Sequence, residues 1–167
     1  MDSVHPDLAI AKKQLYANNN LEQTNFKAEK ESAEYAASTF TLNNLAVIYR
    51  VAKITPTKNG QFVTIWKRNS KGITEPFHVS DSFDFIIISV RNEANIGQFI
   101  FPKSVLLQQK IISGNNKEGK RGMRVYPPWD KPMSKQAEKT QEWQLKHFFS
   151  INNSLSSVEL AQLKKLF

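Results

Sequence analysis

The chain of 167 residues contains no cysteine, which excludes a disulfide framework, an iron–sulfur cluster, a thiolate zinc site and a cysteine nucleophile. It contains only six glycines, and the patterns of nucleotide-binding loops and the Gly-x-Ser-x-Gly pattern of serine hydrolases are absent. Its three histidines lie far apart, so none of them forms a closely spaced pair of metal ligands. No apolar run approaches the roughly 18 residues that cross a bilayer, so we expect no membrane insertion.

What is present is the composition of a folded protein, with 40% apolar residues and 11 phenylalanines among its aromatic side chains. At this length we expect residues 1–167 to form a single domain that buries a sizeable core. Residues 1–7 have neither the basic n-region nor the apolar h-region of a secretory signal. The expected location is therefore the cytoplasm.

The net charge of +8 is unevenly distributed along the chain. Residues 1–44 carry four basic and six acidic residues, whereas residues 45–167 carry 19 basic and nine acidic residues. The surplus is concentrated in segments 58–71 and 103–124. Because each neutralised phosphate releases condensed counterions, such a surplus favours nucleic acid as a partner. This hypothesis requires the cations to converge on one face, and the alternative is a solvated basic surface.

Hydrophobic periodicity predicts an α+β fold, a small mixed or meander-like β-sheet flanked by helices. Helices are expected at 7–17, 27–37, 102–110 and 134–149, and after a capping box formed by Ser156 and Glu159. Strands are expected at 45–54, 61–68, 83–90, 98–101 and 123–126, with a turn at Asn59-Gly60 between the first two.

Two carboxylates are candidate Mg²⁺ ligands, Asp84 at the start of the strand at 83–90 and Glu34 on the helix predicted at 27–37. Lys103 or Lys67 is the candidate lysine beside a scissile phosphate. From residue 27, the order of helix, four strands, helix and strand resembles the core of the PD-(D/E)XK nucleases. The Glu/Gln-x-Lys motif of those enzymes is absent, since Gln98 is followed by two apolar residues. We favour the alternative that Asp84 caps a loop or pairs with a base at the strand entrance.

The segment 119–130, Gly-Lys-Arg-Gly-Met-Arg-Val-Tyr-Pro-Pro-Trp-Asp, is the clearest candidate for phosphate contact. Two glycines flank Lys120 and Arg121, so a ligand can approach the backbone closely beside the guanidinium fork. Arg124 adds a third cation, and Trp129 offers a flat face for stacking. The alternative is an ordinary turn that closes onto a core strand, with Trp129 as packing.

The helix predicted at 134–149 carries three glutamines together with three lysines. Glutamine amides pair with adenine edges, so Gln136, Gln141 and Gln144 are candidates for base contact. Any amphipathic surface helix also shows such residues, so this interpretation stays open beside a purely structural one.

Four segments resemble the MepB-like family, whose name comes from a bacterial multidrug-efflux gene cluster. They are 60–68 (GQFVTIWKR), 97–103 (GQFIFPK), 119–130 (GKRGMRVYPPWD) and 136–144 (QAEKTQEWQ). The resemblance covers roughly residues 28–149. It implies a bacterial cytosolic protein with a nuclease-like core that binds DNA, and it transfers no catalytic motif to this chain.

The sequence thus predicts a nucleic-acid-binding accessory protein without catalytic activity and without a cofactor. The residues expected to bind nucleic acid are Lys67, Arg68, Lys103, Lys110, Lys120, Arg121, Arg124 and Trp129. One alternative is a Mg²⁺-dependent nuclease that uses Glu34, Asp84 and Lys103. A second alternative is an accessory factor of an efflux operon that binds a small molecule or a protein in an aromatic pocket.

Overall fold

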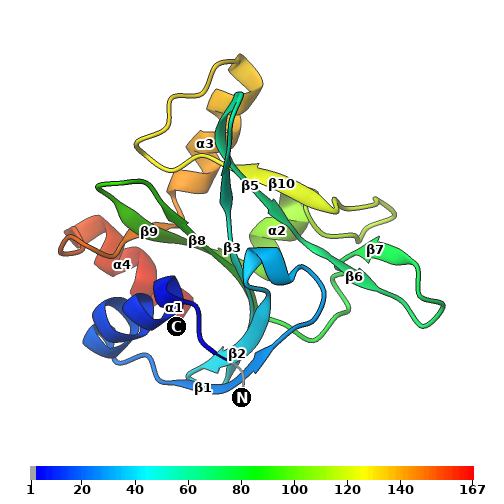
Figure 1. The fold of residues 1–167 in the computed structure, drawn as a ribbon, viewed down its shortest axis with the longest axis horizontal. Coiled ribbons are helices and arrows are strands. Elements are labelled where there is room, and N and C mark those ends of the chain that lie inside the picture. The colour runs from blue at the N-terminus through cyan, green and yellow to red at the C-terminus, as the bar shows by residue number, and fades with distance from the viewer. Residues whose placement is uncertain (1–2) are drawn as a thin grey trace.

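A six-stranded sheet forms the centre of the molecule in the computed structural model, which describes residues 3–167 (Figure 1). Its strands, in spatial order, are β1 (Gln23–Ala28), β2 (Ser38–Leu42), β3 (Leu45–Val51), β8 (Phe85–Arg91), β9 (Ile96–Pro102) and β11 (Phe148–Ser150). Neighbouring strands are antiparallel except β3 and β8, which run parallel in the register Val47↔Phe85. The α+β class with a mostly antiparallel sheet flanked by helices is therefore confirmed.

A second, smaller sheet consists of β10 (Gly122–Val125), β5 (Lys58–Thr64) and β4 (Lys53–Thr55), and β5 leads into the hairpin of β6 (Trp66–Arg68) and β7 (Thr74–Pro76). The turn predicted at Asn59-Gly60 is wrong, because both residues belong to β5 and the turn lies at 56–57. Gly60 instead adopts a left-handed φ of +77° beside an irregularity in the β4–β5 register, a conformation that glycine tolerates without strain.

The predicted N-terminal helix is confirmed, although it changes its hydrogen-bonding pattern along its length. It begins as α1 (Pro6–Ala11), continues as the π-helical η1 (Lys12–Tyr16) and ends in the 3₁₀ turn η2 (Ala17–Asn19). The left-handed Asn20 follows, so the asparagine run does end the helix.

The helix predicted at 27–37 is wrong. Strand β1 occupies its start, and only the 3₁₀ turn η3 (Ala33–Tyr35) is helical. Ser32 and Ala36, on either side of η3, have left-handed φ values of 56° and 50°, which an α-helix cannot contain. Good helix-forming residues were misleading here because the segment lacks an apolar stripe that tertiary packing could bury.

Helices α2 (Lys103–Gln108), α3 (Lys135–Leu145) and α4 (Ser157–Leu166) confirm the three later predictions. Ser134 caps α3 by accepting a hydrogen bond from the Ala137 amide, and the capping box of α4 is present. Helix α3 ends four residues earlier than predicted, because Phe149 pairs with Gln98 as part of β11.

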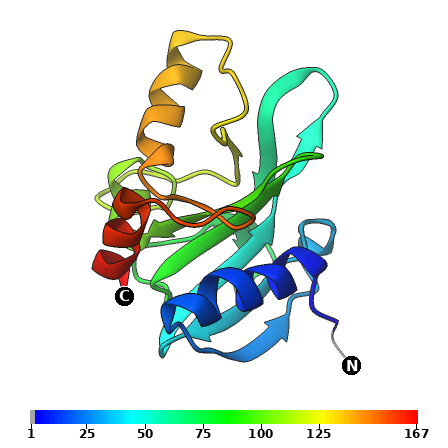
Figure 2. The same cartoon turned by 90° about the vertical axis from the view of Figure 1, so that its left-hand side faces the viewer.

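Each face of the large sheet has its own hydrophobic core. Leu8, Leu15 and Leu163 bring α1, η1 and α4 onto one face, and Figure 2 shows α1 and α4 on that side. On the other face, Val63 and Val125 pack the small sheet against the large one, together with α2 and the partly buried Trp143 of α3. None of the helices in residues 3–167 is long and apolar enough to cross a membrane.

Candidate nucleic-acid interface

Strands β5 and β6 turn one row of side chains toward the core and the other row outward. Val63 and Ile65 are 0% and 1% exposed, whereas Phe62, Thr64 and Trp66 between and beside them are half-buried. Successive side chains of a strand point to opposite faces, so the two aromatic rings lie on the outer side. They are four residues apart, which is roughly 13 Å along an extended chain.

Cationic side chains lie over the aromatic rings of this outer side. The Lys53 ammonium is 5.0 Å from the centre of the Tyr35 ring, which in turn packs edge-to-face on Phe62 at 6.2 Å. The Arg124 guanidinium lies 5.9 Å from Phe62. We call these residues, with Trp66 and Arg68, the cation–aromatic strip.

Arg68 completes the strip on β6, with its guanidinium 5.4 Å from the centre of the Trp66 ring. It forms an ion pair with Glu31, and both side chains are about half exposed. Ser32 follows Glu31 and accepts a hydrogen bond of 2.7 Å from Thr64. An ion pair this exposed contributes at most about 1 kcal/mol, so a phosphate group can displace Glu31 from Arg68.

Lys67 and Lys103 point to the other side of the hairpin and meet at Asp81. The Lys67 ammonium lies 2.6 Å from the Asp81 carboxylate and 3.5 Å from Glu75, and Lys103 donates a hydrogen bond to the Asp81 carbonyl oxygen. The hydrogen bond that Lys67 donates to the Asp81 carboxylate is the main cause that raises the pKa of Lys67. The structure thus brings these two predicted cations together, and it places them beside the carboxylates of Asp81 and Glu75.

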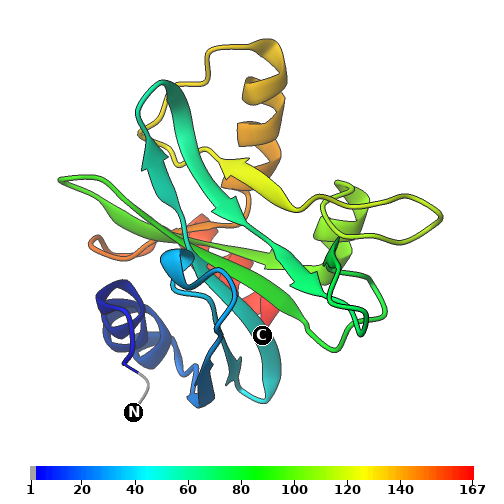
Figure 3. The same ribbon diagram turned by 45° about the vertical axis from the view of Figure 1, so that its right-hand side comes forward.

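The remaining predicted cations come from the segment after α2. Lys110 and Lys120 are exposed, and the Lys120 amide donates to the Ile111 carbonyl. Arg121 pairs with Glu118 at 3.3 Å and donates to the Thr74 carbonyl of β7 at 3.1 Å, which ties the segment to the hairpin. Figure 3 shows the segment and the hairpin projecting on the same side.

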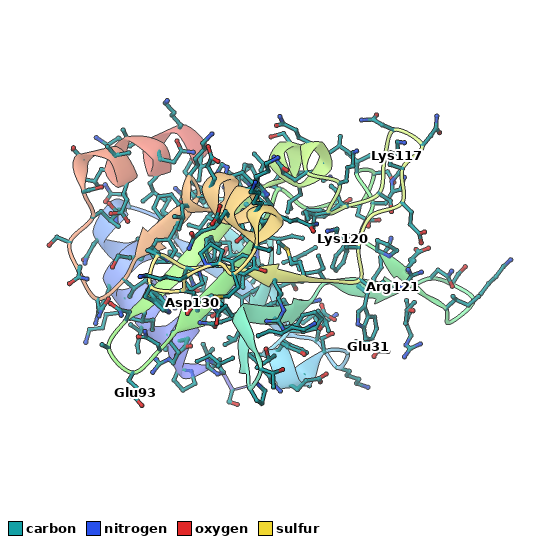
Figure 4. The ribbon with its side chains drawn as sticks, turned by 90° about the horizontal axis from the view of Figure 1, so that it is seen from above. Glu31, Glu93, Lys117, Lys120, Arg121 and Asp130 are labelled. Carbon is teal, nitrogen blue, oxygen red and sulfur yellow. The ribbon has the colours of Figure 1, made fainter. Side chains whose placement is uncertain are left out.

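Figure 4 shows Lys120 and Arg121 at the same end of the molecule as Glu31, away from Asp130. Arg124 lies further along β10, where it donates to Thr55 Oγ1 at 2.8 Å and to the Asn59 carbonyl at 3.3 Å. It shares the outer face of the small sheet with Phe62.

Trp129 lies apart from these cations. Its ring packs edge-to-face on Phe148 at 5.8 Å, and its indole nitrogen is buried with no hydrogen-bond partner among residues 3–167. The side chain thus packs against the hydrophobic core between the large and small sheets.

The candidate Mg²⁺ ligands have other surroundings. Glu34 lies on η3, where its charge adds to the effect of burial in raising the pKa of Tyr35. The Asp84 carboxylate accepts a hydrogen bond of 2.8 Å from the Ala46 amide, and so caps the entrance to the neighbouring strand β3. No three histidine, aspartate or glutamate side chains of residues 3–167 come together as a metal-binding group. Neither carboxylate therefore belongs to such a group.

The glutamines of α3 turn inward. Gln144 is completely buried, and it donates to the Arg124 carbonyl at 2.9 Å and accepts from the Tyr126 amide at 2.8 Å. Gln141 donates to the carbonyls of Tyr126, Pro127 and Asp130. Both side chains hold the end of β10 in place, which leaves only Gln136 of the three exposed to solvent.

A groove opens where the outer face of β2 and β3 extends beyond the small sheet. It has a volume of about 590 Å³, and Arg50 of β3 lines it together with Trp66 and Phe77. Arg50 is only 4% exposed, and this burial lowers its pKa to about 10, against the raising effect of Glu29. A charge this deeply buried is costly unless it is paired and hydrogen-bonded.

The residues that sequence reasoning missed are Lys53, Tyr35, Phe62 and Trp66 of the strip and Arg50 of the groove. The alternation of Phe62 with Val63 was a signal for the outer face of β5. A single arginine within the apolar strand at 45–54 was a signal for a buried charge. No local pattern indicated that Tyr35 would cross over to Phe62, because 27 residues separate them in the sequence.

The fold and site together define an α+β protein with a large sheet, a small sheet and a β-hairpin, and with a cation–aromatic strip that runs along the small sheet and the hairpin. The family model described as MepB-like matches residues 29–150. This chain belongs to the MepB-like family.

Among solved structures, the crystal structure of MepB shares 31% identity and a TM-score of 0.78, covering 90% of this chain and 100% of that chain. A bacterial homing endonuclease shares 16% identity and a TM-score of 0.47, covering 83% of this chain and 88% of that chain. None of the curated proteins compared with this chain matches it.

Proposed function

We propose that this protein binds nucleic acid, without cutting it, through the cation–aromatic strip. The observation that carries the proposal is the series of three cation–aromatic pairs on β4, β5, β6 and the elements beside them. Cations neutralise phosphates, and aromatic faces stack with bases whatever the sequence. The exposed Lys120 and Arg121 beside β7 extend the same surface with further phosphate contacts.

Ionic pairing within the protein does not oppose this function. Glu31 and Glu118 are each about half exposed or more, so their pairs with Arg68 and Arg121 are weak. Exchanging a carboxylate for a phosphate on an arginine also gains the release of counterions from the nucleic acid.

The test is fluorescence anisotropy with labelled single-stranded and duplex DNA and single-stranded and duplex RNA, each titrated with KCl. We expect affinity to fall steeply with salt for at least one of the four. The variant Arg68→Ala/Arg124→Ala should reduce the slope of log K against log salt by about 1.4 on single strands, from about 0.7 per phosphate contact.

The matched control is Lys12→Ala/Lys13→Ala, which removes the same charge from η1 on the opposite face of the large sheet. It should bind like the wild type. The proposal would be overturned if none of the four nucleic acids bound in a salt-dependent way, or if both double variants lost affinity equally. The oligonucleotides should stay intact after Mg²⁺ or Mn²⁺ is added, and cleavage that follows protein concentration would instead support the nuclease alternative.

A further inference from the structure

The groove beside the strip exists because the two sheets differ in extent. Its floor is the face of β2 and β3 that carries Thr39, Thr41 and Ile48. The small sheet and α2 cover the rest of that face, but they do not extend over β2. The volume of about 590 Å³ lies within the range of small-molecule sites.

Aromatic rings form the walls of the groove. Trp66 comes from β6, and Phe77 and Phe83 come from the segment that follows β7. Phe77 and Phe83 pack edge-to-face at 5.9 Å, which fixes the orientation of the Phe77 ring. Walls of this kind favour a flat, aromatic ligand.

The charges around the groove are balanced, since three acidic side chains (Glu29, Glu31 and Asp81) face three basic ones (Arg50, Lys67 and Arg68). Two of each are already paired, Glu31 with Arg68 and Asp81 with Lys67. A phosphate inside the groove would therefore meet as many negative charges as positive ones. This balance favours a ligand that is neutral and polar at its edge.

Arg50 and Glu29 are the two charged residues of the groove that take part in no ion pair within the described part of the chain. Arg50 donates from Nε to the Thr64 carbonyl at 3.1 Å and from Nη1 to the Tyr49 carbonyl at 2.9 Å. Nη2 makes no hydrogen bond with any residue from 3 to 167, and Arg50 forms no ion pair with Glu29 or another carboxylate in that range. A free donor and a free acceptor in one aromatic groove match the edge of a nucleobase, which carries both groups.

We propose that the groove holds one unstacked nucleobase of the bound strand, an inference that rests on the proposed function. The strip would hold the neighbouring phosphates. The ring would lie against Trp66 and Phe77, and its edge would face Arg50 and Glu29.

Free nucleosides test the groove apart from the strip, because they carry no phosphate. We would follow the three tryptophan indole N–H signals by ¹H–¹⁵N NMR while adding adenosine, guanosine, cytidine or uridine, after assigning the Trp66 signal with Trp66→Phe. We expect a saturable shift of the Trp66 signal with at least one nucleoside, and none with inorganic phosphate.

The variant Ala46→Leu fills the groove without changing a charge, and Ala17→Leu makes the same substitution on an exposed position of η2. We expect Ala46→Leu to weaken nucleoside binding at least tenfold and to leave the salt slope for oligonucleotides unchanged, whereas Ala17→Leu should alter neither.

Three results would overturn the inference: no shift with any nucleoside, an equal shift with inorganic phosphate, or equal binding by the two alanine variants. If the protein bound oligonucleotides but no nucleoside, the groove would not be a nucleobase site, and the strip would still be the nucleic-acid interface. Nucleoside binding by a protein that binds no oligonucleotide would remove the proposed function and leave a nucleoside site.

Discussion

Replacing Gln144 by leucine should cost this protein a large part of its stability, although the two side chains are similar in size. Strand β10 is the edge of the small sheet, with β5 on one side only. Gln144 takes the place of a further strand, since its amide bonds both the Arg124 carbonyl and the Tyr126 amide. Gln144→Leu keeps the apolar contacts of the helix and leaves these two backbone groups without partners.

The magnitude follows from the burial of the site. Gln144 is 0% exposed, so a leucine in its place would keep water away from the side of the two backbone groups that the amide now occupies. Each buried polar group left unpaired costs about 1–3 kcal/mol, which gives a loss of roughly 2–6 kcal/mol in the free energy of unfolding. Native proteins of this size are stable by only about 5–15 kcal/mol, so the variant should be close to unfolding.

The assay is equilibrium unfolding in urea, monitored by circular dichroism, with Gln136→Leu as the matched control. Gln136 is an exposed residue of the same helix, and its substitution should change the free energy of unfolding by less than about 0.5 kcal/mol. Faster hydrogen exchange of the Tyr126 amide in Gln144→Leu would locate the effect. The reasoning is refuted if Gln144→Leu is as stable as Gln136→Leu, or if the Tyr126 amide keeps its protection.

Two further predictions concern charge. Burial, and then the charge of Lys146, lower the pKa of His147, so below about pH 6.5 the unfolded chain binds a proton that the folded chain does not. The free energy of unfolding should therefore fall as the pH drops from about 6.5 toward the pKa of the folded state, by up to about 1.4 kcal/mol per pH unit. Urea unfolding at pH 7.5 and 5.5 should show a smaller fall for His147→Gln than for the wild type. An equal fall in the two proteins would contradict the prediction. Lys120→Ala/Arg121→Ala should weaken binding to all oligonucleotide sequences about equally in the anisotropy assay and lower the single-strand salt slope by about 1.4, whereas unchanged binding would dismiss this segment from the interface.

The fold class and the central strands could be predicted because they have strong local signals, whereas β1, β2 and β11 of the large sheet had no predicted counterpart. The apolar run at 83–90 is β8, whose residues from Phe85 to Val90 are all buried, and the Ser156–Glu159 pattern does begin α4. The helix at 27–37 failed because helix propensity is a weak signal where no apolar face is buried.

The candidate site was harder to predict, because it depends on contacts between distant segments. The sequence indicated Arg68 and Arg124 as cations, but not that each would lie over an aromatic ring. It also indicated Asp84 as a carboxylate at a strand entrance, and its bond to the Ala46 amide agrees with the capping role that we favoured. Gln144 shows most clearly what the sequence cannot decide, since a glutamine amide can pair with a base in a groove of DNA or with the backbone at the edge of a strand.

The parallel pairing of β3 with β8 has a consequence for how this surface can change in evolution. Parallel neighbours must be joined by a crossover, and here the crossover contains β4, β5, β6 and β7. Both ends of this excursion are fixed by the large sheet, while its two hairpin tips, at 56–57 and 69–73, lie at the surface. Insertions or deletions at either tip can therefore lengthen or shorten the projecting hairpins while the order of the central strands is inherited intact.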